Sequence, residues 1–88
     1  MKLKYVMVDD VFPIIFSGAM SHRDFKLLRH QYLTGEITSA GFVSVGRDPL
    51  HPESDEILVA AYGRSDSLNL GSKPELDSKI LTKLFNPE

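Results

Sequence analysis

The stretch Glu36–Gly63, EITSAGFVSVGRDPLHPESDEILVAAYG, organises the expected fold. It holds two of the most strand-like runs of the chain, Ile37–Val45 and Glu56–Tyr62. A polar segment with two prolines joins them and is long for a hairpin connection. Because both faces of the first run are partly apolar, that run is predicted to be a central strand. The other segments are expected to add strands and helices around this pair.

The chain has 88 residues, enough for one small domain that spans residues 1–88. Its apolar content of 42% and charged content of 25% are typical of a globular protein and argue against disorder. The core is therefore expected to be small, so a protein partner or a second copy of the chain would add stability.

The charge and the residue types exclude several classes of protein. A net charge of −2 argues against a nucleic-acid binder, and the lack of cysteine excludes disulfides and thiolate sites. The apolar run before Asp9 is too short for a signal peptide, and Val11–Phe16 is too short to span a bilayer. We therefore expect a soluble cytoplasmic protein with no cofactor and no membrane partner.

Alternating apolar residues predict a hairpin whose turn contains Asp9 and Asp10. A two-residue loop would require a backbone N–H from Pro13, which proline lacks, so a four-residue loop from Val8 to Val11 is preferred. Asp-Asp also lacks the glycine that type I′ turns favour. Pro13 then marks an edge strand. In this register one face carries the strongest core set of the sequence, namely Leu3, Tyr5, Met7, Phe12, Ile14 and Phe16.

Two helices are predicted from capping signals and apolar spacing. The first begins at the N-cap Ser21, with Asp24 in the capping-box position, and ends near Gly35. The second begins at the capping box Ser72-Lys73-Pro74-Glu75 and ends at Asn86. The predicted buried stripes contain Phe25, Leu28 and Tyr32 in the first helix, and Leu76, Ile80, Leu81, Leu84 and Phe85 in the second.

With a further short edge strand at Ser67–Leu70, the element order is ββα-ββ(β)-α. This order predicts an α+β domain with an antiparallel sheet of four to five strands and two helices. If both helices cover the same face of the sheet, Val6, Val8 and Ile15 stay open and form a partner-binding surface. The alternative places one helix on each face and leaves no such surface.

The sequence contains no recognisable catalytic motif. His22, His30 and His51 lack the spacing of a metal site and are interpreted as surface residues. No serine lies in a GxSxG elbow. The chain is therefore expected to be non-enzymatic, since a small enzyme would need His22 or His51 to meet a carboxylate across the fold.

Three short segments resemble parts of the response-regulator receiver domain: Val8-Asp9-Asp10, Asp48 and Lys73-Pro74. That domain needs a helix directly after the acidic pair, whereas an apolar strand is expected here. Its parallel five-stranded sheet also does not fit into 88 residues with two helices. Asp9 and Asp10 are therefore interpreted as turn-forming residues and not as metal ligands.

Two polar clusters are candidate binding sites. The first flanks the predicted start of the second helix, where free N–H groups and two basic residues can hold an anion. Its members are Arg64, Ser65, Asp66, Ser72 and Lys73. The second is the loop Asp48–Glu56, which is a candidate docking loop for a basic partner surface. Its candidate contact residues are Asp48, His51, Glu53 and Asp55. The plainer interpretation of the first cluster is helix capping alone, and that of the second is a solvated surface loop.

Several segments together resemble short uncharacterised proteins encoded by bacteriophages and bacterial genomes. They are Lys4–Asp9, Pro13–Phe16, Thr38–Phe42 and the Ser67–Asp77 segment with its Ser-Leu, Ser72, Pro74 and Asp77 pattern. The resemblance covers most of the chain and carries no catalytic residue. It implies a phage-type accessory protein, one class of which binds and blocks host proteins.

Two hypotheses follow from the sequence. In the first, the chain is a non-enzymatic protein-binding module, such as a phage-type accessory or inhibitory (anti-defence) protein, that acts through a sheet face or edge and forms a homodimer. In the second, it binds a small anionic ligand, such as a nucleotide or a phosphorylated metabolite, at the start of the second helix.

Overall fold

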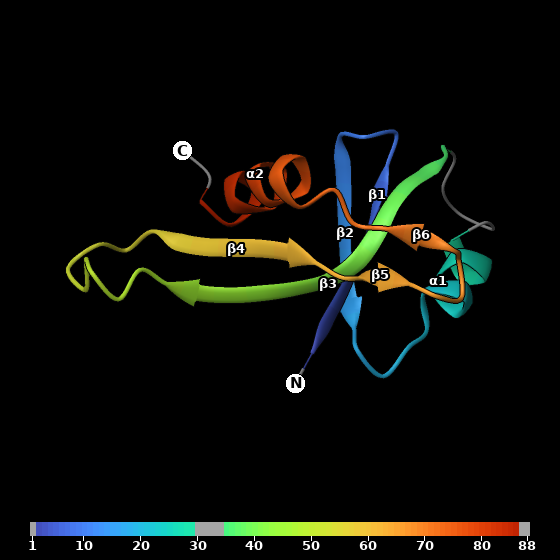
Figure 1. Ribbon diagram of the computed structural model, residues 1–88, viewed down its shortest axis with the longest axis horizontal. Coiled ribbons are helices and arrows are strands. Elements are labelled where there is room, and N and C mark those ends of the chain that lie inside the picture. The colour runs from blue at the N-terminus through green and yellow to red at the C-terminus, as the bar shows by residue number, and fades with distance from the viewer. Residues whose placement is uncertain (1, 30–34, 87–88) are drawn as a thin grey trace.

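The computed structural model describes residues 2–29 and 35–86, which form an α+β domain (Figure 1). Its elements are β1 (Leu3–Val8), β2 (Phe12–Ser17), α1 (His22–Arg29), β3 (Ile37–Arg47), β4 (Ile57–Tyr62), β5 (Arg64–Ser65), β6 (Leu70–Gly71) and α2 (Pro74–Phe85). The main sheet is antiparallel in the order β2-β1-β3-β4, and β5 and β6 form a separate two-stranded sheet. The predicted fold class, the central position of β3 and the edge position of Pro13 in β2 are confirmed.

The strand β3 is long enough to belong to two parts of the molecule. Its first part pairs with β1 as far as Val43, which lies opposite Leu3. Its second part, from Phe42 to Arg47, pairs with β4. The hairpin of β3 and β4 therefore extends beyond the end of β1 as an arm, residues 42–62 (Figure 1). This arm accounts for the elongated shape of 42 × 25 × 19 Å.

The first hairpin differs from its predicted register by one residue. Met7 lies opposite Pro13, and the loop between Val8 and Phe12 has three residues. Asp9 and Asp10 adopt φ angles of 53° and 61°, and the Val11 N–H donates to the Val8 carbonyl oxygen at 3.2 Å. The two aspartates thus adopt the left-handed conformation, although they lack the glycine that such turns favour. Their interpretation as turn residues is confirmed, but the four-residue loop is wrong.

The register shift moves half of the predicted core set to the other face, because neighbouring residues of a strand point to opposite faces. Tyr5 and Met7 pack with Val43, Val59 and Leu81 on the face covered by α2. The opposite face carries a second core cluster of Val6, Ile37 and Ala40, against which Ile14, Phe16, Phe25, Leu68 and Leu70 pack. The prediction that Leu3, Tyr5, Met7, Phe12, Ile14 and Phe16 share one face is therefore wrong.

Both faces of the sheet are covered over β1, so the open valine-rich surface is also wrong. Val6 and Val8 are buried, and Phe25 of α1 and Leu68 lie over the cluster that contains Val6. Ile15 lies on the other face, half-buried beside the core under α2. The alternative with one helix on each face is the arrangement that the chain adopts.

The helix α1 begins as its capping signal predicts. The Ser21 Oγ accepts a hydrogen bond from the Asp24 N–H at 3.0 Å. Phe25 stacks on Phe16 of β2 with the ring centroids 4.5 Å apart. The structure does not describe the side chains of Leu28 and Tyr32, which were predicted to be buried, or the end of this helix before Gly35.

The start of α2 and part of its buried face differ from the prediction. The N-cap residue is Lys73, and the Ser72 hydroxyl donates instead to the Gly63 carbonyl oxygen at 2.8 Å, so the capping box does not form. Leu76 and Leu84 are exposed, whereas Asp77 and Leu81 are buried. The predicted contacts of Ile80, Leu81 and Phe85 with the core are confirmed, whereas Asp77 takes a core position that was not predicted.

The helix α2 also closes the outer edge of β4 through a polar ladder of Ser78, Thr82 and Asn86. The Ala61 N–H donates to the Ser78 Oγ at 2.9 Å, and the Val59 N–H donates to the Thr82 Oγ1 at 3.3 Å. The Ile57 N–H donates to the Asn86 Oδ1 at 2.8 Å. Two further bonds run from Thr82 and Asn86 to the carbonyl oxygens of Val59 and Ile57. This edge is therefore unavailable to another strand.

The segment between β4 and α2 forms a small hairpin where one short edge strand was predicted. Residues 66–69 form a turn, so the predicted strand Ser67–Leu70 lies mostly in the turn between β5 and β6. Gly63 starts this hairpin with a φ of 74°, a conformation that favours glycine. The chain then passes close to β3, since a Cβ on Gly41 would lie 2.5 Å from the Tyr62 carbonyl oxygen.

Candidate functional site

Within the described residues, one face of the arm is covered by no helix beyond Phe42, whose ring contacts His22 of α1 (His22–Arg29). Neighbouring side chains alternate between faces, so Val43, Val59 and Ala61 face α2 and are buried. The opposite side, called the open face below, carries Phe42, Ser44, Leu58, Ala60 and Tyr62. Leu58 and Tyr62 are 42% and 41% exposed.

The inner end of the open face is an aromatic cluster with one positive charge. Phe42 and Tyr62 lie opposite each other and stack with their ring centroids 5.7 Å apart. The Lys2 Nζ lies 5.3 Å from the centroid of the Phe42 ring, within the range of a cation–π interaction. The open face is thus apolar in its middle and positive where it meets the body.

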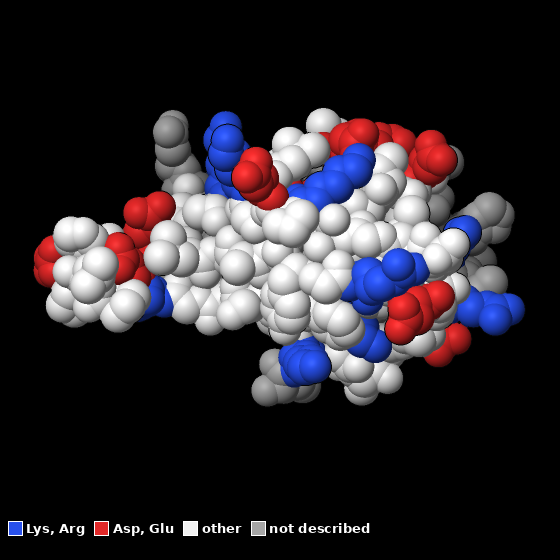
Figure 2. Space-filling model, in the orientation of Figure 1, with Lys and Arg blue, Asp and Glu red and all other residues white. Residues whose placement is uncertain are grey.

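The tip of the arm, residues 47–56, has the opposite charge. It contains four carboxylates and one arginine, and Figure 2 shows acidic side chains gathered at this end of the molecule. Arg47 pairs with Asp55 at 4.0 Å, and the His51 Nδ1 lies 3.5 Å from Glu53. Leu50 is 82% exposed in a turn that the Asp48 carboxylate stabilises by accepting the Leu50 N–H at 2.9 Å.

The predicted docking residues are therefore together at the tip. His51, Glu53 and Asp55 are exposed, and Asp48 is half-buried by its role in the turn. Their part in binding stays a prediction. The exposed Leu50 and the open face were not identified from the sequence, because they depend on how far β3 and β4 extend beyond β1.

The predicted anion site is divided among several internal contacts. The Lys73 Nζ pairs with Asp10 at 2.7 Å, and Arg64 pairs with Asp66 at 3.1 Å and with Asn69 at 2.7 Å. Ser65 is buried, and its Oγ accepts the Leu68 N–H at 3.2 Å. An anion at this site would have to displace Asp10 from Lys73.

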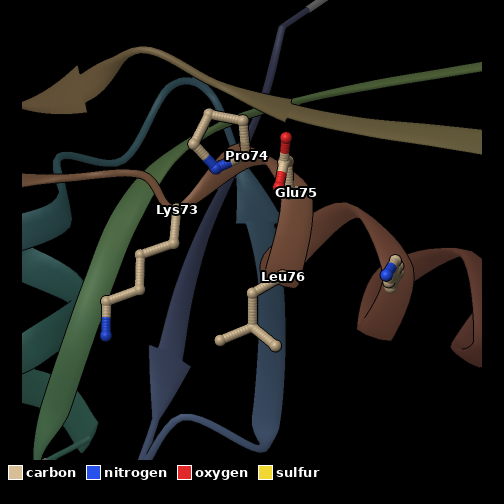
Figure 3. A pocket seen from close by; sticks show the side chains of 5 residues that line it. Lys73, Pro74, Glu75 and Leu76 are labelled. Carbon is tan, nitrogen blue, oxygen red and sulfur yellow. The ribbon is translucent and has the colours of Figure 1, made fainter.

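The surface at the start of α2 is a shallow hollow of about 650 Å³, lined by Lys73, Pro74, Glu75, Leu76 and Lys79 (Figure 3). The side chains of Lys73, Glu75 and Leu76 point in different directions in this view. No set of donors converges on one point there. Ligand binding at this hollow stays a prediction that the geometry does not favour.

The start of α2 is instead joined to the first hairpin by ionic contacts. The hydrogen bond from Lys73 lowers the pKa of the Asp10 carboxyl, and the same contact raises the pKa of Lys73. The Asp10 N–H also donates to the Thr38 Oγ1 at 3.0 Å, and the Glu36 N–H donates to the Asp9 Oδ1 at 3.0 Å. The acidic pair therefore ties the turn to β3 and α2, which is a structural role.

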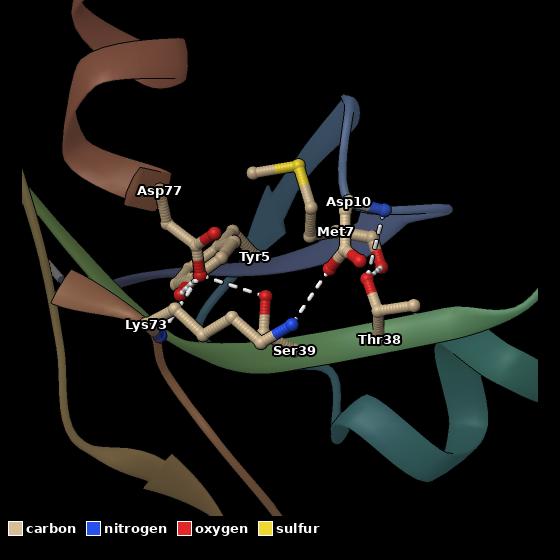
Figure 4. Close-up of polar contacts among 7 residues, drawn as sticks. All are labelled: Tyr5, Met7, Asp10, Thr38, Ser39, Lys73 and Asp77. Atoms are coloured by element: carbon tan, nitrogen blue, oxygen red, sulfur yellow. Dashed lines mark hydrogen bonds and ion pairs between the residues drawn. The ribbon is translucent and has the colours of Figure 1, made fainter. Parts of the chain in front are cut away.

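A buried polar cluster lies beneath this contact, where Tyr5, Ser39 and Asp77 point toward one another from β1, β3 and α2 (Figure 4). The Asp77 Oδ2 accepts from the Tyr5 hydroxyl at 2.5 Å, the Ser39 hydroxyl at 2.7 Å and the Lys73 N–H at 3.0 Å. The Asp77 Oδ1 makes no hydrogen bond within the described part of the chain.

The cluster holds α2 on the sheet and offers no access to a substrate. Tyr5, Ser39 and Asp77 are all fully buried. Burial, together with the Asp77 contact, raises the pKa of the Tyr5 phenol far above its ordinary value, so the phenol stays a hydrogen-bond donor at physiological pH. We assign this cluster to folding, and the sequence analysis did not identify it because its members are up to 72 residues apart.

His22 is buried, which corrects its interpretation as a surface residue. Its ring lies edge-on to Phe16 and Phe42, with centroids 5.3 and 6.0 Å away. The Nε2–H donates to the Gly41 carbonyl oxygen at 2.8 Å. Burial lowers the pKa of this imidazole, and the Lys4 charge acts in the same direction.

We expect the buried His22 to make stability depend on pH. Because its pKa is lower in the folded chain than the ordinary 6.5, the unfolded chain takes up the proton first as the pH falls. The free energy of unfolding should therefore decrease between pH 7.5 and 5, by about 1.4 kcal/mol for each unit of the pKa difference. Urea titrations at several pH values measure this slope. His22→Gln should flatten it and His51→Gln should not; an equal slope in His22→Gln would contradict the assignment.

Comparisons of the chain with protein-family models, with curated proteins and with solved structures find no match. The described residues include no cluster of three or more histidine or acidic side chains that could hold a metal ion. In residues 2–29 and 35–86, no helix has both the length and the apolar character to cross a bilayer.

Proposed function

We propose that the protein is a non-enzymatic protein-binding module whose contact surface is the arm. The observation that carries this proposal is the open face, on which Leu58 and Tyr62 remain exposed beside the Phe42 ring. Apolar surface of this kind on a small domain is typical of a protein-interaction site. The resemblance to phage-encoded proteins supports an accessory or inhibitory role toward a host protein.

The charge of the arm determines the kind of partner that fits it. The tip carries Asp48, Glu53, Asp55 and Glu56 against a single arginine, so a complementary surface is basic there. The middle of the open face is apolar and contains the small residues Ser44 and Ala60, which permit close approach of another surface. A partner with an apolar patch next to a basic rim therefore fits both features.

Site-specific photo-crosslinking tests this proposal. A crosslinking amino acid replaces Leu58 on the open face, and a control chain carries it at Leu76, which is similarly exposed at 45% on α2. In extract of the native host, we expect one other protein to be crosslinked at position 58 and not at position 76. Excess wild-type chain should abolish the crosslink. The charge-reversed variant Glu53→Lys/Asp55→Lys should compete much less.

Two results would overturn the proposal. One is the same set of crosslinked proteins at positions 58 and 76, which would show that the open face is not selective. The other is equal competition by the wild type and by Glu53→Lys/Asp55→Lys, which would show that the acidic tip contributes nothing.

A further inference from the structure

One segment of β3 has no neighbouring strand on one of its sides within the described residues. Pro13 lies in the edge strand β2, and the ladder of α2 closes the edge of β4. On the remaining side, β1 ends at Leu3 opposite Val43, whereas β3 continues to Arg47. Residues 44–47 therefore have β4 on one side, and no strand of residues 2–29 or 35–86 lies on the other.

The direction of the backbone groups follows from the ladder. Because Ile57, Val59 and Ala61 direct their backbone groups to α2, the alternate residues Leu58 and Ala60 face β3. Their partners in β3 are Gly46 and Ser44. The N–H and C=O groups of Val45 and Arg47 consequently point away from β4 to the unpaired side, where they can extend the sheet by another strand.

We propose that this strand is β3 of a second copy, paired antiparallel about a two-fold axis at Gly46. The axis places Val45 opposite Arg47 of the second copy. Gly46 suits the axis, because even a Cβ there would meet no atom within 4 Å. The two arms then form one sheet in the order β4-β3-β3-β4. The middle of each open face, at Leu58 and Ala60, remains accessible, so this homodimer goes beyond the proposed binding function.

The charges at the two ends of the arm favour a second copy of the chain, rather than an unrelated strand, as the partner of β3. Antiparallel pairing brings each acidic tip to the end of β1 in the other copy, where Lys2 supplies a positive charge. A hollow of about 380 Å³ lies at that point, lined by Lys2, Leu3, Val43, Ser44, Val45 and Tyr62. The segment around the exposed Leu50 of the other copy lies next to this hollow. The tip and the β1 end are thus complementary in charge.

Sedimentation equilibrium of the full chain tests the dimer. The wild type should show a monomer–dimer equilibrium. Val45→Pro should be monomeric, because it removes an N–H that β4 does not use. Since proline can also disturb folding, Leu50→Asp provides a second variant at an exposed loop position. It should raise the dimer dissociation constant at least about 10-fold. A wild type that is monomeric at every accessible concentration, or two variants that dimerise like it, would overturn the proposal.

Mixing two charge variants distinguishes this geometry from other dimers. Lys2→Glu alone and Glu53→Lys/Asp55→Lys alone should each weaken self-association, because both tip contacts become repulsive. An equimolar mixture should form heterodimers with nearly the wild-type dissociation constant, since both contacts become attractive again. Absence of this recovery would contradict the proposed pairing.

The outcome is separate from that of the crosslinking experiment. Self-association without a crosslink to another protein would retain the dimer and remove the binding module. A monomeric wild type that still gives the crosslink to another protein would remove the dimer and retain the binding module.

Discussion

Replacing Asp77 with alanine is expected to lower the free energy of unfolding by at least about 3 kcal/mol. The buried hydroxyls of Tyr5 and Ser39 and the partly buried Lys73 N–H would lose their common acceptor. A buried donor left without a partner costs about 1–3 kcal/mol. Bulk water cannot replace the acceptor there, because Tyr5, Ser39 and Asp77 are all fully buried. For a domain of this size the loss should lower the Tm by more than about 12 °C. Urea unfolding and calorimetry measure both values.

Glu75→Ala is the matched control, because it removes an exposed carboxylate from the first turn of the same helix. Its effect should be within about 0.5 kcal/mol of the wild type. Tyr5→Phe should cost less than Asp77→Ala, since it removes one of the three donors. If Asp77→Ala were as mild as Glu75→Ala, the assignment of the cluster to folding would be wrong.

The second large effect is expected from removing the polar ladder with Ser78→Ala/Thr82→Val/Asn86→Ala. The variant loses five hydrogen bonds between α2 and the edge of β4. At about 1 kcal/mol for each bond, the free energy of unfolding should fall by about 3–5 kcal/mol. The exposed edge should also cause self-association, because unpaired strand edges pair with other chains.

Hydrogen exchange gives the more specific measurement of this effect. The amides of Ile57, Val59 and Ala61 should lose protection, whereas those of Leu58 and Ala60, which face β3, should lose less. Thr82→Ser is the conservative control, because it retains the hydroxyl that bonds both backbone groups of Val59. Equal loss of protection at all five amides would indicate that the variant unfolds globally and would contradict a local role for the ladder.

The strands and the class of the fold were predictable because they depend on local patterns. The alternation in Ile37–Val45 and Glu56–Tyr62 predicted the central hairpin, and the apolar content of both faces placed β3 inside the sheet. Ser21 predicted the start of α1 through a contact three residues away. Each of these inferences required only neighbouring residues.

The register of the first hairpin and the burial of Asp77 in α2 were not predictable in the same way. The two φ angles of Asp9 and Asp10 decided which face Phe12, Ile14 and Phe16 occupy. In α2, a carboxylate took a core position because Tyr5 and Ser39 supply donors there. Apolar periodicity treats such an aspartate as a surface residue.

The candidate site was predicted only in part. The acidic loop was identified from composition, and the structure places it at the end of a projecting arm. The open face was assigned to the wrong strands, because Val6 and Val8 of β1 are covered while Leu58 and Tyr62 of β4 are not. The four-residue spacing of Ser78, Thr82 and Asn86 is a sequence pattern that indicates a polar helix face, but its partner in β4 becomes evident only in the folded chain.

The sequence by itself determined the four strands of the main sheet, the two helices and the absence of a catalytic motif, since these follow from residue types and their spacing along the chain. Only the tertiary structure decided which surfaces remain free. β1 ends at Leu3 while β3 continues to Arg47, and α2 closes the edge of β4. Exposure of the open face and of the β3 edge is a property of how segments of different length pair. Such pairing depends on contacts between residues far apart in the chain, and local patterns do not record it.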